Sequence, residues 1–441
     1  MVYPGKDERE IAFEYVKSFI AFMSISKAEQ MERSSENSPY PSEALLLSLE
    51  DYNEKFNHVP SFRVNYDPHS FLPDRSANRF ISRGPFRVIH DSAPLSLNWH
   101  LTSSCSTDCK YCYLRRRKLN LLSYERLRQL IDEAVEIGVF EISLLGGDVL
   151  LYPHLTDVME LLHRHKFLPM SLSTKTFLSE EKAFALAKTR ELLYEMQFSI
   201  DSDDAAISEY LVGVADFPEK MFSSIDNAVR AGLNVATKSV ITPHNLITIP
   251  RLYRKLKERG VNRIRLAAYS RSGFHHTDDL FLTQEDFDWL NNEVDKLNSE
   301  FAGDNIIVQN GQPDFERRSA ESLKAAWPNR SMCTAGRVCM MICADGKVIP
   351  CEQMPETDEY FCGDLTTQTI AEVWNGDRLK EMTYGMPREK FQGLPCYDCD
   401  ERNECHNVIG FCIRDLAVHY GDIYQTPTNC YKSTLPHIRM T

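Results

Sequence analysis

Six short apolar runs, separated by stretches with apolar residues at helical spacing, fill the middle of this 441-residue chain. One such stretch places Leu127, Leu130, Ile131 and Ala134 on one face of a helix. Strands that alternate with helices form parallel sheets, whose chemistry lies at the carboxyl ends of the strands. We therefore predict an α/β domain with its site at that edge. The predicted strands are residues 95–101, 140–146, 167–173, 195–201, 234–241 and 262–268.

Three cysteines follow the first predicted strand, at Cys105, Cys109 and Cys112 in the segment CSTDCKYC. Thiolates are the usual ligands of iron–sulfur clusters, and a cubane cluster normally takes four. A group of three leaves one iron open to a small molecule. Zinc is the alternative, because Cys-x2-Cys steps also suit tetrahedral zinc. No fourth cysteine is near, and His100 lies on the other side of the strand end, so the pattern favours a cluster.

This cysteine spacing resembles that of the radical S-adenosylmethionine (SAM) enzymes, and the resemblance covers about residues 91–290. It implies a partial (β/α)6 TIM-like barrel in which the open iron of a [4Fe-4S] cluster binds SAM. Reductive cleavage of SAM would then give a 5′-deoxyadenosyl radical that removes a hydrogen atom from the substrate. Tyr111 stands where that family has an aromatic residue against the adenine.

A glycine pair ends the second predicted strand. Gly146, Gly147 and Asp148 stand where the radical SAM family has Gly-Gly-Glu-Pro, with Asp148 in place of Glu and Val149 in place of Pro. Glycines at this point would let backbone carbonyls approach the SAM ammonium without a Cβ in the way. The resemblance therefore implies that Gly146, Gly147 and Asp148 bind the SAM amine, although a Gly-Gly turn after a strand is common.

Polar residues also end the third and fourth predicted strands. Ser199 and Asp201 project in the same direction by the two-residue period of a strand, and they fall where the family contacts the ribose and methionine parts of SAM. Ser173 and Lys175 end the preceding strand, and Lys175 is placed to meet the SAM carboxylate. The alternative for each is an ordinary strand-end cap, or, for Lys175, an exposed lysine.

Composition limits the class of protein. The net charge of −13 disfavours nucleic-acid binding, which needs clustered Lys and Arg. No apolar run approaches the ~18 residues that span a bilayer, and no secretion signal is present, so we expect no membrane association and a cytoplasmic location. Thirteen cysteines in such a chain indicate metal ligands rather than disulfides. The basic run 115–118 is either a solvated face or a contact for an acidic substrate or a reductase.

Ten of the thirteen cysteines lie between residues 333 and 430. Their spacing, with Gly346, resembles the SPASM extension of radical SAM enzymes, which holds two auxiliary clusters; six residues rather than three separate Cys405 from Cys412. The resemblance implies that one cluster takes Cys333, Cys339, Cys351 and Cys412. It implies that the other takes Cys396, Cys399, Cys405 and Cys430. Zinc is again the alternative for the second group.

Other features of residues 331–441 are less specific. Their turns, prolines and charges predict little apolar core, so bound metal would be needed to stabilise the folded segment. Cys343 and Cys362 have no ligand role and are predicted to be buried thiols, although replacement of Cys339 or hydrogen donation to a radical are alternatives. Glu352 stands where sulfatase-maturing relatives carry a catalytic carboxylate that accepts a substrate proton; an ordinary surface Glu is the alternative.

Residues 1–90 precede the predicted barrel and form a small N-terminal domain. Residues 11–28 and 44–56 have helical apolar patterns. Peptide-modifying radical SAM enzymes often bind a leader peptide with a domain at this place, and a helical cap on the barrel is the alternative. Residues 291–330 are predicted to bridge the barrel to the cysteine-rich domain.

These features together predict a peptide maturase with three [4Fe-4S] clusters and SAM as cofactors. It would abstract hydrogen from a side chain of a ribosomally made precursor peptide and form a carbon–carbon or thioether cross-link. Flavodoxin or ferredoxin would donate electrons. The alternatives are a sulfatase-type maturase that makes formylglycine, a dehydrogenase of a small molecule, and a zinc-ribbon scaffold without chemistry.

Overall fold

The computed structural model describes residues 64–65, 87–88, 93–94, 96–114, 120–139, 141–165, 167, 170–304, 306–327 and 333–441. The predicted N-terminal helices and the basic run 115–118 lie outside these residues. From the N-terminal region, the described part holds one antiparallel pair, β1 (Val64–Asn65) with β2 (Arg87–Val88).

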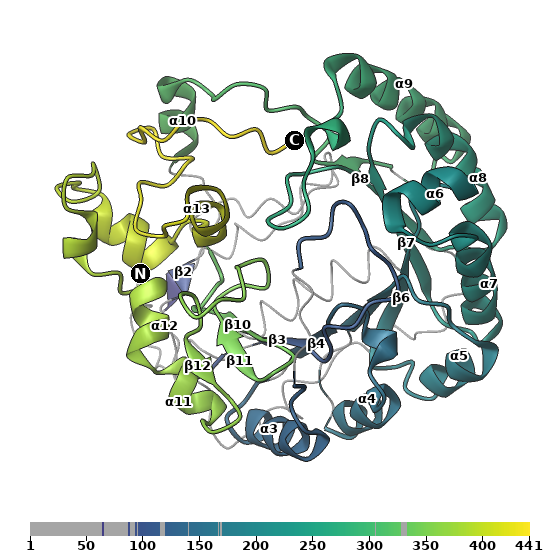
Figure 1. Cartoon of the computed structure of the whole chain (residues 1–441), viewed down its shortest axis with the longest axis horizontal. Coiled ribbons are helices and arrows are strands. Elements are labelled where there is room, and N and C mark those ends of the chain that lie inside the picture. The colour runs from purple at the N-terminus through teal and green to yellow at the C-terminus, as the bar shows by residue number, and fades with distance from the viewer. Residues whose placement is uncertain are drawn as a thin grey trace.

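All six predicted strands are present, and neighbours that pair run parallel. They follow one another around an open ring in sequence order (Figure 1). The strands are β3 (Ser96–His100), β4 (Glu141–Leu145), β5 (Met170–Thr174), β6 (Leu193–Ser199), β7 (Val235–Ile241) and β8 (Arg263–Ala268). The partial (β/α)6 barrel is thus confirmed.

The strands do not form one continuous sheet, however. β3 pairs with β4, and β5 to β8 pair in order, but within the described residues no ladder joins β4 to β5. A side chain links the two strand ends instead. Asp148, just after β4, accepts hydrogen bonds from the Thr174 hydroxyl at 2.7 Å and from the Lys175 backbone N–H at 2.7 Å.

Helices cover the outside of the barrel (Figure 1). They are α3 (Tyr124–Glu136), α4 (Leu155–Arg164), α5 (Glu180–Ala187), α6 (Ala205–Val212), α7 (Phe217–Arg230), α8 (Ile249–Glu258) and α9 (Gln284–Glu300), with short 3-10 turns η3 (Val149–Leu151), η4 (Leu246–Thr248) and η5 (Asp278–Leu280). α3 buries Leu127, Leu130, Ile131 and Ala134, as the helical spacing predicts. The Ser123 hydroxyl caps α3 by accepting from the backbone N–H of residue 126 at 3.1 Å.

The cysteine-rich region continues the barrel sheet. β10 (Cys339–Ile342) pairs parallel with β3, and β11 (Lys347–Ile349) and β12 (Gly363–Asp364) extend that edge. β9 (Val308–Gln309) extends the opposite edge next to β8. The remaining elements are α10 (Ala320–Ala326), α11 (Ile370–Trp374), α12 (Asp377–Met382), η7 (Arg388–Phe391), the π-helix η8 (Asn403–Ile409) and α13 (Ile413–Tyr420).

The prediction of little apolar core in residues 331–441 is wrong. Met340, Met341, Trp374 and Phe391 are fully buried there, and they belong to the same hydrophobic cluster as the barrel core. The prediction failed because it treated this region as a separate small domain. Packing on the barrel supplies the apolar partners that the segment lacks alone, so metal is not its only source of stability.

The C-terminal segment ties the two regions together. The Asp314 carboxylate accepts hydrogen bonds from the backbone N–H groups of Met440 at 3.0 Å and Thr441 at 2.8 Å. The backbone N–H of Arg271, in the loop after β8, donates to the Met440 carbonyl at 2.7 Å.

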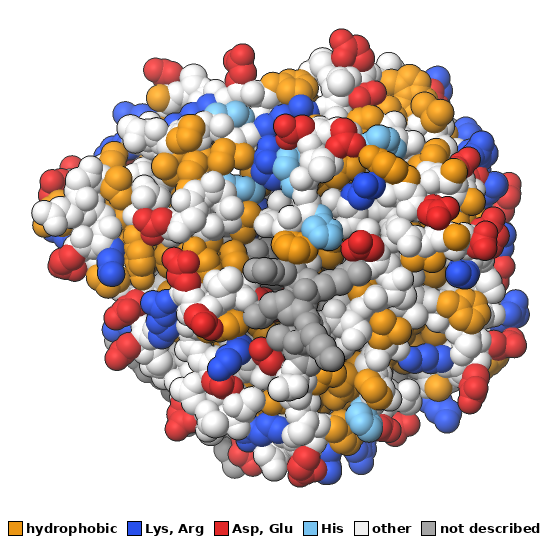
Figure 2. Space-filling view, viewed as in Figure 1, with side chains coloured by type: hydrophobic (Ala, Val, Ile, Leu, Met, Phe, Trp, Pro, Cys, Tyr) orange, Lys and Arg blue, Asp and Glu red, His pale blue; other side chains and the backbone are white. Residues whose placement is uncertain are grey.

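On the face shown in Figure 2, Lys and Arg side chains are interspersed with Asp and Glu. Among the described helices, none has the length and apolar character to cross a bilayer.

Candidate active site

The three N-terminal cysteines lie on one loop, residues 101–114, at the carboxyl end of β3. The turn after β4 holds one side of this loop, because the backbone N–H groups of Gly147 and Asp148 donate to the carbonyls of Thr102 at 2.8 Å and Ser104 at 2.7 Å. The end of α6 holds the other side, since the Asp108 N–H donates to the Val212 carbonyl at 2.7 Å. We call residues 101–114 the cluster loop.

The glycine pair makes room for the cluster loop. A Cβ on Gly146 would lie 2.7 Å from the Thr102 carbonyl oxygen, and a Cβ on Gly147 would lie 2.3 Å from the Ser104 carbonyl oxygen. Real Cβ atoms do not approach backbone this closely. The glycines thus allow close packing of two backbone segments, and their predicted contact with the SAM ammonium stays a prediction.

Thr107 connects two of the thiols, because its hydroxyl lies 3.4 Å from the Sγ atoms of both Cys105 and Cys109. Burial raises the pKa of the Cys109 thiol, and the Lys175 ammonium opposes this rise. Among the described residues, no three His, Cys, Asp or Glu side chains surround a single metal-ion position. A cluster differs from one ion because each thiolate binds its own iron. Three thiols on one buttressed loop beside a cation therefore fit an anionic iron–sulfur cluster.

The loop after β8 packs on the cluster loop. The Ser272 hydroxyl donates to the Cys112 carbonyl at 2.8 Å, and the His275 backbone N–H donates to the same oxygen at 3.0 Å. The His275 ring Nδ1 lies 3.0 Å from the Cys109 carbonyl oxygen. Sequence reasoning missed both residues, because a Ser and a His in a loop carry no signal of their distant partner.

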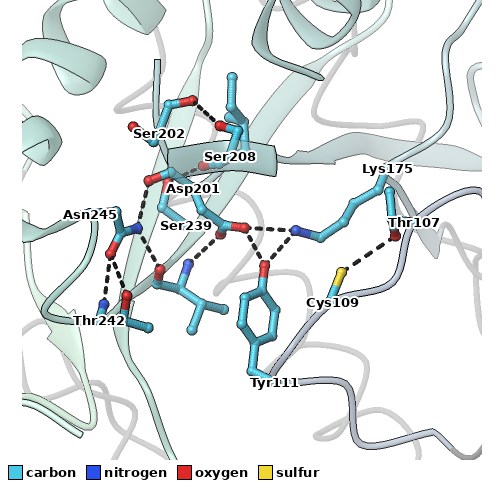
Figure 3. A network of polar contacts seen from close by, with 12 residues as sticks. Thr107, Cys109, Tyr111, Lys175, Asp201, Ser202, Ser208, Ser239, Thr242 and Asn245 are labelled. Atoms are coloured by element: carbon cyan, nitrogen blue, oxygen red, sulfur yellow. Dashed lines mark hydrogen bonds and ion pairs between the residues drawn. The ribbon is translucent and has the colours of Figure 1, made fainter. Parts of the chain in front are cut away.

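Three predicted SAM-site residues meet beside Cys109 (Figure 3). The Lys175 Nζ lies 2.8 Å from Asp201 Oδ2 and 2.6 Å from the Tyr111 hydroxyl, and that hydroxyl also donates to Asp201. Burial and the Asp201 carboxylate raise the pKa of Tyr111 well above its ordinary value. Burial lowers the pKa of Lys175, but Asp201 and Cys109 outweigh it and the pKa is raised.

A buried polar network fixes Asp201, which is 1% exposed. Its Oδ1 accepts from the Val240 N–H at 2.8 Å, and the Asn245 side-chain amide donates to the Asp201 carbonyl at 2.6 Å (Figure 3). The Asn245 Oδ1 accepts from the Thr242 N–H at 2.7 Å. The sequence analysis did not identify Asn245. Its only signal was the Thr-x-x-Asn spacing after β7, which is typical of an ordinary turn.

Of the other predicted SAM contacts, Asp148 reaches this group through the Lys175 backbone N–H. Both oxygens of the Asp148 carboxylate already accept hydrogen bonds from Leu150, Thr174 and Lys175. Ser173 is exposed and accepts from Gln197 at 2.9 Å. Ser199 is half-buried and its hydroxyl makes no hydrogen bond with any described residue.

The C-terminal cysteines gather into two groups. Cys339 and Cys351 lie near Cys333: burial raises the pKa of Cys339 to about 12, and the neighbouring thiols of Cys351 and Cys333 add to the rise. Cys412 of the same predicted set is exposed, precedes α13, and has Asp415 rather than another thiol as its main charged neighbour.

The second group contains Cys396, Cys399 and Cys430. Burial raises the pKa of Cys396 to about 11, with Cys430 and Cys399 adding to the rise. The Lys432 ammonium donates to the Cys399 Sγ at 3.2 Å. Cys405 of this predicted set is buried on η8. Two further thiols, Cys343 and Cys362, are 0% and 7% exposed and belong to the apolar core, in line with the buried-thiol prediction.

Glu352 directly follows Cys351 in the sequence. It is half-buried and lies near enough to Tyr113, on the cluster loop, to raise the pKa of that phenol together with burial. Burial and Arg265 lower the pKa of Lys238, whereas Glu352 opposes this change. Lys238 lies directly opposite Arg265 across β7 and β8. Glu352 is therefore close enough to act on the charge states of both Tyr113, on the cluster loop, and Lys238, on β7.

Comparison with known proteins agrees with this site. Residues 99–256 match the radical SAM superfamily, and residues 333–400 match the SPASM iron–sulfur cluster-binding domain. The chain is a radical SAM enzyme with a SPASM domain, and its cofactors are SAM and iron–sulfur clusters. The zinc-ribbon scaffold is therefore wrong as a description of the whole protein.

Among curated relatives, PqqA peptide cyclases are similar to this chain. The enzyme from Granulibacter bethesdensis is 23% identical over 354 residues, which cover 78% of this chain and 89% of the relative. The one from Methylorubrum extorquens (strain PA1) is 24% identical over 361 residues, which cover 79% and 87%.

Two solved structures share the fold. Streptococcus suis SuiB bound to its precursor peptide SuiA has a TM-score of 0.57 at 19% identity, and the match covers 78% of this chain and 76% of SuiB. The enzyme anSMEcpe with bound AdoMet and the Kp18Cys peptide has a TM-score of 0.53 at 17% identity, with 77% and 94% covered.

Proposed function

We propose that this enzyme modifies a ribosomally made precursor peptide and forms a carbon–carbon or thioether cross-link in it. The observation that carries the proposal is the hydrogen-bonded group of Tyr111, Lys175 and Asp201 beside Cys109 on the cluster loop. Glu352 lies close enough to this loop to act on the charge state of Tyr113. The peptide cyclases that cover most of this chain support a peptide substrate.

Three [4Fe-4S] clusters are part of this proposal. Cys105, Cys109 and Cys112 would hold the first. The two C-terminal groups, completed by Cys412 and Cys405, would hold the auxiliary clusters, and Cys412 would have to approach Cys333, Cys339 and Cys351. When bound, the first cluster and SAM supply the 5′-deoxyadenosyl radical.

The chain's own residues bind and orient SAM. The Lys175 ammonium would pair with the SAM carboxylate, and Asp201 and Tyr111 keep Lys175 in place at 2.8 and 2.6 Å. Backbone carbonyls near Gly146 and Gly147 would receive the SAM ammonium. Asp148 would act as a positioning residue, because its carboxylate is already occupied by Leu150, Thr174 and Lys175.

Glu352 would accept the proton that the second reacting atom, a carbon or the sulfur of a thiol, loses as the new bond forms. Carboxylates act as general bases when they lie within reach of the reacting group, and Glu352 directly follows Cys351, a proposed ligand of an auxiliary cluster. An adjacent auxiliary cluster would take the remaining electron. We also infer that a flavodoxin or ferredoxin donates electrons, and that residues 1–90 recognise a leader peptide.

The test is anaerobic incubation of reconstituted enzyme with SAM, dithionite and candidate precursor peptides, read by mass spectrometry. A cross-link appears as loss of two hydrogens without an aldehyde. In Glu352→Gln, 5′-deoxyadenosine formation should persist while cross-linked product falls. An aldehyde on a Cys or Ser of the peptide would instead identify the formylglycine-forming maturase.

A further inference from the structure

Arg337 is a buried cation in the cysteine-rich region. It lies four residues after Cys333, before β10, and is 3% exposed. One guanidinium nitrogen, Nη2, donates to two backbone carbonyls, those of Thr383 at 3.1 Å and His406 at 2.7 Å. The Nε of Arg337 is buried and has no hydrogen-bond partner among the described residues.

Among the described residues, the groups whose charges act most strongly on Arg337 include no carboxylate. Burial lowers its pKa, and the groups that oppose this are Cys333, Cys405 and Tyr384. A buried charge without a counter-charge is strongly unfavourable in a folded protein. Two carbonyl oxygens solvate the guanidinium but do not neutralise it. The chain therefore places a cation where the available anions are thiolates.

The two thiols belong to different proposed clusters. Cys333 is assigned to the auxiliary group with Cys339 and Cys351, and Cys405 to the group with Cys396, Cys399 and Cys430. Cys405 lies on the π-helix η8, which also supplies the His406 carbonyl. π-helices are rare and often mark functional sites. Arg337 therefore lies close enough to one thiol of each proposed cluster site, Cys333 and Cys405, to interact with its charge.

The backbone around Arg337 is fitted to it. Gly410, which ends η8, has φ of +73°, and a Cβ there would lie 2.7 Å from the Arg337 Nη1. Any other residue at position 410 would displace the guanidinium, because both the space and the left-handed backbone favour glycine. This close fit argues against an arginine that is buried by chance.

We propose that Arg337 is a counter-charge shared by the two auxiliary cluster sites, and that it raises the reduction potential of both clusters. This rests on the proposed auxiliary clusters. A reduced cluster is more negative than an oxidised one, so a fixed buried cation stabilises the reduced form. Sharing one cation also couples the sites, since a charge change at either one alters the field at the other.

The test uses the full-length reconstituted enzyme. Iron, sulfide and the EPR-monitored redox titration of each cluster are measured for the unaltered chain, Arg337→Gln and Arg337→Lys. Arg388→Gln is the matched control, because it removes a positive charge from an exposed side chain that pairs with Asp398 in the same region. Circular dichroism and melting temperature report whether each variant folds.

In Arg337→Gln, both auxiliary potentials should fall, with the reduced-to-oxidised ratio at a fixed poise dropping about tenfold, or about 59 mV for one electron. Arg337→Lys, which keeps the charge, and Arg388→Gln should stay near the unaltered values. If Arg337→Gln does not fold, Arg337→Met, which also removes the charge but leaves no polar group buried, takes its place: auxiliary potentials below those of Arg388→Gln support the proposal, and potentials equal to those of Arg388→Gln overturn it.

Two outcomes would contradict different claims. Unchanged potentials in a folded, fully loaded Arg337→Gln overturn the role of Arg337 and leave the proposed function intact. An unaltered chain with only the first cluster, at about four irons rather than about twelve, overturns the auxiliary clusters themselves.

Discussion

At the scale of single residues, the site depends on groups whose partners are distant in the sequence. Tyr111, Lys175 and Asp201 come from the cluster loop, the end of β5 and the end of β6, and they meet in one hydrogen-bonded group. Sequence patterns predicted all three individually, because strand-end position and family spacing are local. They did not predict that the residues pair with one another, since pairing depends on the barrel closing.

The glycine packing leads to a prediction at position 147. Gly147→Ala should displace the cluster loop, because its Cβ would lie 2.3 Å from the Ser104 carbonyl oxygen. A shift near 1 Å at reacting groups costs about a hundredfold in rate, and we expect a loss of that order in 5′-deoxyadenosine formation. Gly303→Ala is the control, because no atom lies within 4 Å of its added Cβ. Equal activity in both variants would contradict the packing role.

The buried ion pair leads to a prediction at position 175. Lys175→Met leaves the Asp201 carboxylate, which is 1% exposed, without its counter-charge. Removing one partner of a buried pair costs about 3 kcal/mol of unfolding free energy. Adding Asp201→Asn should restore part of this loss, because the orphaned charge is then gone. Urea unfolding of the single and double variants measures both effects, and strictly additive losses would refute the pairing.

At the scale of helices and strands, the sequence predicted the features that depend on local patterns but not the pairings between distant segments. The six strands and the buried face of α3 follow from apolar spacing. The pairing of β10 with β3 joins Cys339 to Ser96 across the whole barrel sequence. No local signal in the sequence marks this pairing. Because the pairing was not predicted, the apolar core of residues 331–441 was not predicted either. The lack of a β4–β5 ladder within the described residues was also not predicted. The two strand ends are joined by the side chain of Asp148 instead, and the sequence does not show such a contact.

One contact between elements predicts a pH effect. Asp203, in the loop after β6, pairs with Arg251 at 2.7 Å and Lys255 at 2.6 Å on α8. Burial alone would raise the pKa of Asp203, but these cations outweigh it and the pKa is lowered. Its stabilisation is therefore present above the unfolded pKa near 3.9 and is lost as pH falls through the lower folded pKa.

Asp203→Asn should lower stability by about 1 kcal/mol at pH 7, a value kept small because both cations are solvent-exposed. Melting temperatures of the two proteins between pH 7 and pH 2.5 provide the measurement. The difference should shrink at the acidic end. A difference that stays constant over the whole range would show that the carboxylate charge is not responsible.

At the scale of the whole molecule, one chain of contacts joins the cysteine-rich region to the first cluster site. The Asp314 carboxylate accepts a hydrogen bond from the Met440 backbone N–H, and the Met440 carbonyl accepts one from the Arg271 backbone N–H. Next to Arg271, the Ser272 hydroxyl donates to the Cys112 carbonyl. Asp314→Ala should loosen this chain and increase hydrogen exchange in residues 269–279. Asp358→Ala, at an exposed position, is the control. Unchanged exchange in Asp314→Ala would show that the C-terminal segment does not support the site.

The central claim is that three thiolates on the cluster loop leave one iron free to bind SAM. The most direct measurement is the yield of 5′-deoxyadenosine from SAM and dithionite under anaerobic conditions, in the unaltered enzyme and in Cys109→Ala. We predict product from the unaltered enzyme, and in Cys109→Ala neither product nor the iron of the first cluster. No 5′-deoxyadenosine from a fully loaded enzyme, or the same yield and iron content in Cys109→Ala, would contradict the claim.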